Sequence, residues 1–367
     1  MNNCLCIVTL LLLSGCGSSL PKGGEEPPLD IEDYLSVNLT HFSLPEVGGT
    51  QTLSITANTV WNALSNALWC SASPNSGSHG NTSVLISAPS NYTGSSRSAE
   101  LTFTAGKVSK TCVVSQESAQ MPNYVPDGYT LVWQDEFETP PRVPDVDKWW
   151  YETGKSGWGN HELQNYIPGF VGQDTCALVS NGTLKIIAKK RGSEVISIRM
   201  NTVEGWTYGY FEGRLKLPTG KGTWPAFWMM PKNFTTWPGD GEIDIMEEVG
   251  YDPNTVLSTI HCTAYNHSIG TQKGGSRYVS TAQTDFHIYA VEWTEDFIKG
   301  YVDGFCYFTF LNDKAGHKDT WPFYTPFYLK LNLAWGGDWG GAQGVDESFL
   351  PATYEIDYIR VYQKITE

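Results

Sequence analysis

The sequence has little positive charge, no paired cysteine motif and no long helix-forming segment. Its 367 residues include 24 Lys and Arg against 39 Asp and Glu, which gives a formal net charge of −15. Without a basic stripe the chain cannot replace the counterions of a nucleic-acid backbone, so we expect no nucleic-acid partner. An uncharged ligand fits this composition better.

Cysteine is sparse beyond the N-terminus. Five of the eight cysteines follow residue 16, namely Cys70, Cys112, Cys176, Cys262 and Cys306. An odd number without a CxxC pair predicts neither a disulfide framework nor a zinc site. Most of these side chains are expected to be small, buried and apolar, and a Cys70–Cys112 bridge stays open as an alternative.

The long apolar run "CLCIVTLLLLSGC" lies at the N-terminus and is too short to span a membrane. It ends in Leu13-Ser14-Gly15-Cys16, which resembles the lipobox of bacterial lipoproteins, although "MNNCLC" lacks the usual Lys or Arg. The resemblance implies a signal peptide at 1–15 and a lipid on Cys16; an ordinary cleaved signal peptide is the alternative. We therefore expect a cell-envelope protein, an outer-membrane lipoprotein exposed at the cell surface, that contacts the membrane through its anchor alone.

The rest of the chain reads as strands and turns. Residues 16–32 are rich in Gly, Ser, Pro and acids and predict a flexible tether. Residues 33–117 form short alternating runs, such as "TQTLSITAN" and "SAELTFTAG", separated by turn residues, which predicts a small Ig-like β-sandwich. After a linker at 118–127, residues 128–365 contain longer strands and predict one large second β-domain. The fold class is therefore all-β.

The first of these domains resembles the BACON module found ahead of bacterial polysaccharide hydrolases. Trp61, Trp69 and the closing "CVVSQES" carry the resemblance. Such modules are often assumed to bind carbohydrate, but no cluster of exposed aromatic residues is evident in the sequence. A role as a spacer is at least as well supported.

The segment "GDGEIDIMEEVG" concentrates four acids in an otherwise apolar strand. Side chains alternate along a strand, so Glu242 and Asp244 share a face and Glu247 would point to the other. A β-bulge around Ile245-Met246 restores parity and places all three on one face. Glu248 is then expected on the core side or at a strand edge, without a chemical role.

Such an arrangement suits a retaining glycosidase. Four effective strand steps span about 13 Å, and two inward-leaning glutamates narrow this gap toward the ~5–5.5 Å that a retaining enzyme needs. Mutual repulsion is expected to split the carboxyl pKa values, so that one group is an ionised nucleophile and another a protonated acid. A Ca²⁺ site and a solvated edge strand are the alternatives, and both fit the Ile-Asp-Ile-Met context less well.

"EIDIME" resembles the E-x-D-x-x-E signature of the bulge-containing branch of glycoside hydrolase family 16, the laminarinase and β-glucanase group. "SGWGNHELQNY", "YGYFEGRLKLPTGKGTWPAFWMMP" and "PFYLKLNLAWGGDW" resemble further family segments, in family order. The resemblance implies a large β-jelly-roll (concanavalin A-like) with a concave substrate groove. It also implies Glu242 as nucleophile, Asp244 as its electrostatic helper and Glu247 as acid/base.

The same resemblance implies residues that bind sugar. Asn160, Arg214, Trp224 and Trp237 match positions that contact substrate in the family, and Trp237 is the strongest stacking candidate. The family places a histidine beside the catalytic Asp or the incoming sugar, which favours a site role for His261.

Other residues near these motifs are less typical or have two interpretations. Trp335 replaces a residue that is usually small and aliphatic, so we expect it to contact the substrate and reshape the groove. Asp338 stands where the family usually has Asn, and we expect this change to reshape the groove too. Glu162 either binds a sugar hydroxyl or supports Asn160, and Trp228 is expected in the core.

The function that these observations predict is endo-acting, retaining hydrolysis of mixed β-1,3/1,4-glucan or β-1,3-glucan by a monomer. No cofactor is required. Glu136 and Asp357 match family positions that hold a structural Ca²⁺ on the convex face, so such an ion is a further expectation. The alternatives are an enzyme of the family that acts on galactans, a transglycosylase, and a non-catalytic glycan-binding lipoprotein.

Overall fold

The computed structural model describes residues 32–67, 69–137 and 143–364. The chain divides into two compact units, Met1–Met121 and Pro122–Glu367, and the division falls inside the segment predicted as a linker. The predicted signal peptide, Cys16 and nearly all of the tether lie outside the described residues. Across the described ranges, no helix is both long enough and apolar enough to span a membrane.

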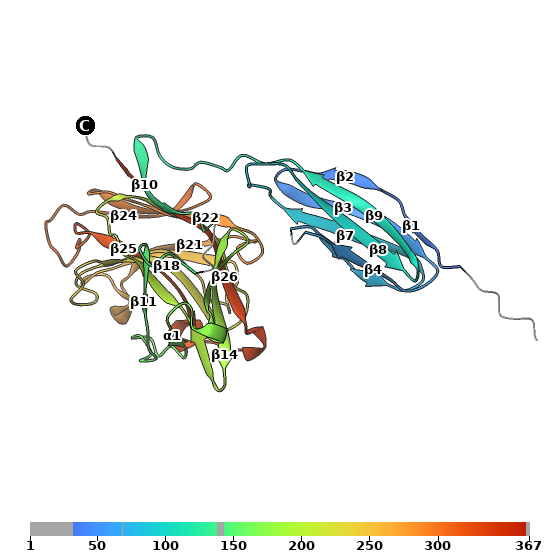
Figure 1. Ribbon diagram of the computed structural model, residues 1–367. Coiled ribbons are helices and arrows are strands. Elements are labelled where there is room, and N and C mark those ends of the chain that lie inside the picture. The colour runs from blue at the N-terminus through green and yellow to red at the C-terminus, as the bar shows by residue number, and fades with distance from the viewer. Residues whose placement is uncertain (1–31, 68, 138–142, 365–367) are drawn as a thin grey trace, which may run out of the picture. The chain divides into compact units, whose positions relative to one another are not determined.

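The N-terminal unit is a small sandwich of two sheets, ordered β1-β3-β7-β5 and β2-β9-β8-β4-β6. Its strands are β1 (Leu35–Val37), β2 (His41–Leu44), β3 (Gly48–Ala57), β4 (Trp61–Ser65), β5 (Ser71–Ser73), β6 (Ser76–Gly77), β7 (Gly80–Pro89), β8 (Arg97–Ala105) and β9 (Val108–Gln116) (Figure 1). Strict alternation explains the core: in β8, Ala99, Leu101, Phe103 and Ala105 are buried while the residues between them are more exposed.

The tryptophans of this unit do not form a sugar-binding platform. Trp61 is buried in the core, and the guanidinium of Arg97 lies 4.3 Å from the ring centroid of Trp69. Cys70 and Cys112 are buried free thiols, so the bridge that the sequence left open is not formed. Cys176 and Cys262 are also buried, as expected, whereas Cys306 is exposed.

The C-terminal unit packs a ten-stranded sheet against a seven-stranded sheet. The ten-stranded sheet has the order β12-β15-β14-β26-β17-β22-β23-β24, with β10 paired to β26 and β13 to β14. Its strands are β10 (Tyr129–Asp135), β12 (Asn165–Tyr166), β13 (Ala177–Ser180), β14 (Thr183–Arg191), β15 (Glu194–Ser197), β17 (Gly209–Lys216), β22 (His287–Trp293), β23 (Phe297–Val302), β24 (Phe305–Leu311) and β26 (Ala352–Lys364). One contiguous apolar core fills the space between the two sheets.

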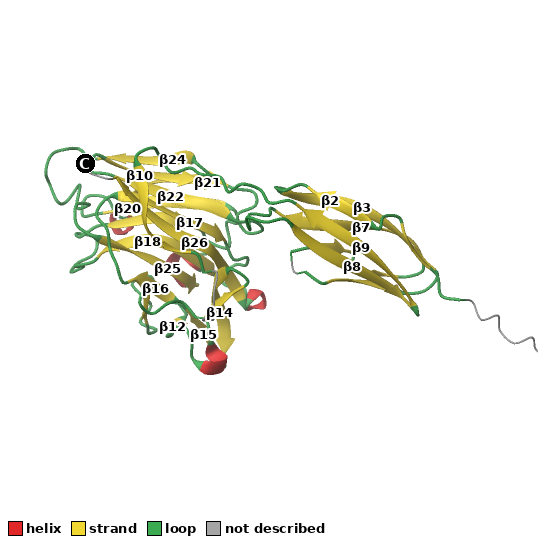
Figure 2. Cartoon of the chain, turned by 45° about the horizontal axis from the view of Figure 1, so that its top comes forward, coloured by secondary structure: helices red, strands yellow, loops and turns green. Residues whose placement is uncertain are grey.

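The seven-stranded sheet has the order β11-β16-β25-β18-β19-β20-β21. Its strands are β11 (Trp149–Glu152), β16 (Arg199–Thr202), β18 (Thr223–Pro231), β19 (Glu242–Glu247), β20 (Thr255–His261), β21 (Lys273–Tyr278) and β25 (Phe327–Trp335). Helical segments are short: α1 (Gly337–Gly340) and the 3-10 turns η1 (Gly172–Asp174), η2 (His267–Ile269) and η3 (Glu347–Phe349). Figure 2 shows that strands dominate both units, which confirms the predicted all-β class.

Strand β25 shows how the sequence separates core from site. Its odd-numbered residues, Phe327 to Trp335, are fully buried in the core between the sheets. The even-numbered Tyr328, Lys330 and Asn332 point to the opposite face, where they line a cavity. This outer face of the seven-stranded sheet is the one that carries the acids of β19.

Candidate active site

The acid-rich strand β19 contains one extra residue relative to both of its neighbours. Against β18, Asp244 pairs with Trp228 and Met246 pairs with Phe227. Because Trp228 and Phe227 are adjacent, Ile245 has no partner on β18. Against β20, the register shift falls between Asp244 and Glu247. This is the β-bulge that the acid spacing predicts, and it is confirmed at the predicted position.

The bulge separates the two kinds of side chain on β19. The apolar ones are fully buried in the core: Ile243, Ile245 and Met246. The acids Glu242, Asp244 and Glu247 instead line a cavity of about 430 Å³, called the groove below. In a regular strand without this bulge, Glu247 would point toward the core. Glu248 is fully buried and accepts a hydrogen bond from the Asn254 backbone, which confirms that it lies away from the groove.

Two indole groups hold the outer acids. Trp237 Nε1 donates to Glu242 Oε2 at 3.2 Å, and Trp224 Nε1 donates to Glu247 Oε1 at 2.9 Å. Both tryptophans line the groove. Each ring therefore combines an apolar face, on which a sugar ring could stack, with a donor that fixes a carboxylate.

His261 lies behind the acids. It pairs with Glu242 across β19 and β20, is only 6% exposed, and its Nε2 lies 3.3 Å from Asp244 Oδ2 and 3.8 Å from Glu242 Oε1. It thus contacts the acids rather than the groove wall, which is the first of the two family placements that the sequence left open. Glu242, Asp244 and His261 also offer ligand atoms within 4.8 Å of one another, a spacing that a metal ion could bridge.

Burial is the main influence on the three acids. It raises the pKa of Glu242 to about 8 and that of Glu247 to about 8, and it raises the pKa of Asp244 well above its ordinary value. Repulsion from Asp244 adds to the rise at both glutamates, while His261 opposes it. Burial thus acts on both glutamates in the same direction, and the split that the sequence predicts stays a prediction.

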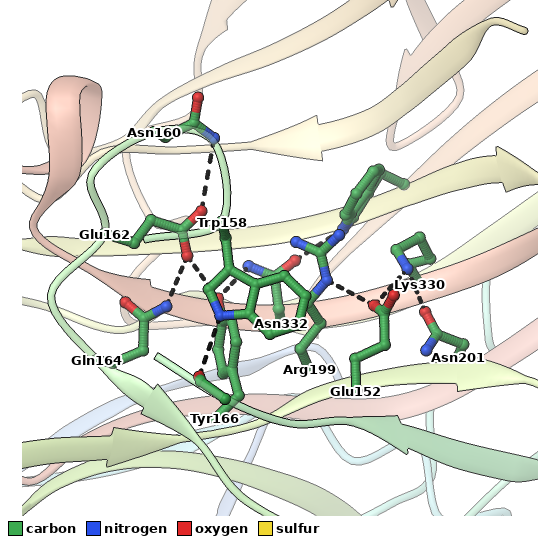
Figure 3. Close-up of polar contacts among 12 residues, drawn as sticks. Glu152, Trp158, Asn160, Glu162, Gln164, Tyr166, Arg199, Asn201, Lys330 and Asn332 are labelled. Carbon is green, nitrogen blue, oxygen red and sulfur yellow. Dashed lines mark hydrogen bonds and ion pairs between the residues drawn. The ribbon is translucent and has the colours of Figure 1, made fainter. Parts of the chain in front are cut away.

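The loop before β12 brings Asn160 to the groove. Asn160 Nδ2 lies 3.5 Å from Glu162 Oε1, and the other oxygen of Glu162 accepts from Gln164 at 2.6 Å and Tyr166 at 3.1 Å (Figure 3). Glu162 is 8% exposed, so its main contacts are structural and it supports Asn160. A Cβ at Gly337 would lie 2.8 Å from the Asn160 carbonyl oxygen, so the close approach of this loop to α1 requires glycine.

The prediction for Arg214 is wrong. Arg214 lies on β17, in the other sheet, where its NH1 donates to Asp357 Oδ2 at 2.7 Å. Its neighbours Gly213 and Leu215 face the core, so the Arg214 side chain points to the outer surface of the ten-stranded sheet. The arginine that lines the groove is Arg199 on β16.

The prediction for Trp335 is also wrong, and that for Trp228 is correct only in part. Trp335 is 1% exposed and packs in the core with the leucines of β25, so it does not reshape the groove. Asp338 accepts from His161 at 2.8 Å on the exposed loop instead. Trp228, expected in the core, is buried as expected, but in a small apolar cluster with Ala226 and Met230 on the groove face of the sheet and not between the two sheets; it lines the groove and donates from Nε1 to Asn332 Oδ1 at 2.7 Å.

The sequence interpretation missed several groove residues. They are Glu152, Trp158, Arg199, His267, Lys330 and Asn332. Alternation offered a signal for two of them, because Lys330 and Asn332 stand between the core leucines of "YLKLNLAW". Glu152 and Arg199 depend on which strands become neighbours, whereas Trp158 and His267 lie in connecting segments, and spacing alone reveals neither placement.

The residues matched to a structural Ca²⁺ are already paired. Both oxygens of Glu136 accept from Arg360, at 2.7 and 2.8 Å, and Asp357 accepts from Arg214. A calcium ion bound by these two carboxylates would have to displace arginine from at least one of them. As arranged, the two acids do not fit that site.

Comparison with known proteins agrees with this geometry. Residues 169–360 match the model of glycosyl hydrolases family 16, and residues 59–117 match the BACON domain model. The chain is 47% identical over 248 residues to a beta-glucanase of Rhodothermus marinus, covering 64% of this chain and 85% of the relative.

Solved structures give the same assignment. The laminarinase from Rhodothermus marinus matches at a TM-score of 0.62 and 45% identity, covering 65% of this chain and 98% of that chain. SCLam, described as a non-specific endo-β-1,3(4)-glucanase, matches at a TM-score of 0.62 and 47% identity, covering 67% and 95%. The expected resemblance to both families is thereby confirmed, and the chain belongs to glycoside hydrolase family 16 and carries a BACON domain.

Proposed function

We propose that this protein is an endo-acting β-glucanase that cleaves β-1,3-glucan or mixed β-1,3/1,4-glucan with retention of configuration. The observation that carries the proposal is the set of three acids that the bulge of β19 turns into one groove, with indole donors on the outer two. The similar proteins named above act on β-glucans, which supports the substrate class.

The reaction follows from the roles of the two glutamates. Glu242 attacks the anomeric carbon while Glu247 gives its proton to the glycosidic oxygen, so the C–O bond breaks and the leaving sugar departs as an alcohol. Glu247 then removes a proton from water, whose oxygen displaces Glu242 from the anomeric carbon. Two inversions at one carbon give net retention.

The electrostatics of the groove suit these roles. Because burial raises the pKa of Glu247 to about 8, this group holds the proton that it must donate near neutral pH. The nucleophile must be ionised, and the neighbouring His261 and Arg199 oppose the rise that burial causes in the pKa of Glu242. Asp244, kept protonated by burial, is placed to donate a hydrogen bond to the ionised nucleophile.

Digestion of a glycan panel tests the proposal. Barley-type mixed-linkage glucan, laminarin, lichenan, agarose and xyloglucan are incubated with the protein, and the products are sized and followed by NMR. We expect ladders of oligosaccharides from the β-glucans, with the β-anomer formed first. Cleavage of agarose alone would indicate a galactan-active enzyme, and binding without cleavage would indicate a glycan-binding protein.

We also propose that the protein is a monomeric lipoprotein of the cell envelope, anchored through Cys16. The lipobox-like "LSGC" and the tether that follows it support the anchor, and one chain supplies every groove residue named above. In bacteria that express the gene, Cys16→Ser is expected to abolish incorporation of labelled palmitate and to release the protein from the membrane fraction. Unchanged labelling of this variant would contradict the anchor.

A further inference from the structure

A lysine is buried under the floor of the groove. Lys330 is 1% exposed, and its Nζ lies 4.9 Å from the ring centroid of Trp228 and 5.0 Å from that of Tyr328. In the sheet register it stands opposite Trp228, which stands opposite Asp244. Lys330 is therefore two strands away from the central acid of the site, on the same face.

One carboxylate oxygen connects this lysine to an arginine. Glu152 Oε2 accepts from Lys330 Nζ at 2.7 Å and from Arg199 Nε at 2.6 Å, and Lys330 also donates to Asn201 Oδ1 at 2.5 Å (Figure 3). The contacts link β11, β16 and β25, which are adjacent in the sheet. Two cations thus share one anion, so Glu152 neutralises Arg199 only in part.

The arginine itself faces the groove. Its guanidinium carbon lies 4.7 Å from the ring centroid of Trp158 and 4.8 Å from that of Trp228, and Arg199 lines the groove. Nε is held by Glu152, while the terminal nitrogens donate to no atom among residues 32–67, 69–137 and 143–364. Those nitrogens are available to sugar hydroxyl groups.

We propose that Lys330 is a positioning residue: by holding Glu152 it fixes Arg199 between Trp158 and Trp228 as a binding surface for sugar units distant from the cleaved bond. The inference rests on the proposed glucanase function and deepens it. Arg199 is separated from Glu247 by β25 and β18, because it pairs with Asn332, Asn332 with Ala226, and Ala226 with Glu247. Only substrates long enough to cross those strands use this surface.

The test compares Lys330→Met with wild type on β-glucan oligosaccharides from trisaccharide to heptasaccharide. We expect the KM of the long oligosaccharides to rise about ten-fold relative to that of the trisaccharide, since binding that is equal in ground and transition states affects KM alone. Because Arg199 also influences the ionisation of Glu242, any change in kcat should be the same for all lengths. Lys299→Met, a lysine of β23 in the other sheet, is the matched control and should behave as wild type.

A second variant tests the path through Glu152. Glu152→Gln is expected to raise the KM of long oligosaccharides in the same way, and the double variant Glu152→Gln/Lys330→Met should add little, because both changes disturb one shared oxygen. Equal kcat/KM losses on all lengths would show a merely structural role and overturn the proposal. An unchanged length profile in Lys330→Met would overturn it too.

The pH dependence gives an independent readout. Burial and the nearby Arg199 lower the pKa of Lys330 to about 7, while Glu152 and Glu242 oppose this. In wild type, the KM ratio of heptasaccharide to trisaccharide should therefore rise between pH 6 and pH 8, and in Lys330→Met it should stay flat. The ratio cancels the titration of Glu242, which both substrates share. Absence of any wild-type hydrolysis would instead contradict the proposed function.

Discussion

Replacing Glu242 or Glu247 with alanine is expected to lower kcat on β-glucan by about 10⁴-fold, with binding of the glycan largely retained. The two acids act in every turnover, one by forming a covalent bond and the other by moving a proton, so neither can substitute for the other. Initial rates on soluble β-glucan, together with affinity electrophoresis in the same polysaccharide, measure both properties.

Azide distinguishes the two roles. In Glu242→Ala, azide enters the space that the nucleophile leaves and should restore cleavage of an activated substrate with formation of an α-glycosyl azide. In Glu247→Ala, azide should attack the covalent intermediate and give a β-glycosyl azide. The opposite pattern would reverse the assignment of nucleophile and acid/base.

Glu248→Gln is the matched control for these variants. Glu248 follows Glu247 directly, but its carboxylate accepts from the Asn254 backbone and from Gln283, away from the groove. The variant is expected to lose some stability and to keep its kcat. If Glu242→Ala and Glu247→Ala also kept wild-type turnover, the site would not be the one on β19.

The bulge could be predicted because the acidic and the apolar residues of β19 both constrain which face of the strand each side chain occupies. Three acids and three large apolar residues of β19 require opposite faces, and an extra residue at Ile245-Met246 satisfies both sets. Alternation applied in the same way to β25 would have placed Trp335 with the leucines in the core. Applied to β18, it would have placed Trp228 on the face of Trp224, in the groove.

The errors at Arg214 and at the missed Arg199 have a different cause. Both arginines lie on strands, and alternation shows which residues share a face but not which sheet a strand joins. β16 and β17 follow each other in the chain yet belong to different sheets. The contacts among Glu152, Arg199 and Lys330 likewise depend on the pairing of strands far apart in sequence.

Stability should fall as the pH rises through the range in which the buried acids ionise. The pKa of Glu242 in the folded protein is about 8, against about 4.3 in an unfolded chain, so between these values the folded state binds more protons. The free energy of unfolding then decreases with pH, and the favourable contribution is complete only below the unfolded pKa. Glu247 and Asp244 shift in the same direction.

Glu242→Gln isolates this effect. The amide keeps the size of the side chain and can still accept from Trp237, but it does not ionise. Near pH 4 the variant should match wild type, and at pH 8 it should be more stable by about 2 to 4 kcal/mol, which raises the Tm of the larger unit by about 5 °C or more. Calorimetry at several pH values measures the difference, with the exposed Glu204→Gln as control.

The difference between the variant and wild type is more informative than the pH profile of either, because other groups titrate too. The pKa of Glu152 is lowered to about 2, mainly by Arg199 and Lys330 against the effect of burial, so its contribution changes only in acid. Lys330 acts in the opposite sense above pH 7, where the unfolded chain still holds a proton that the folded protein has lost. Both effects are common to the two proteins and largely cancel.

A stability difference between Glu242→Gln and wild type that stays constant from pH 5 to pH 8 would mean that Glu242 ionises near its ordinary pKa. In that case burial in the groove would not be what sets the ionisation of Glu242.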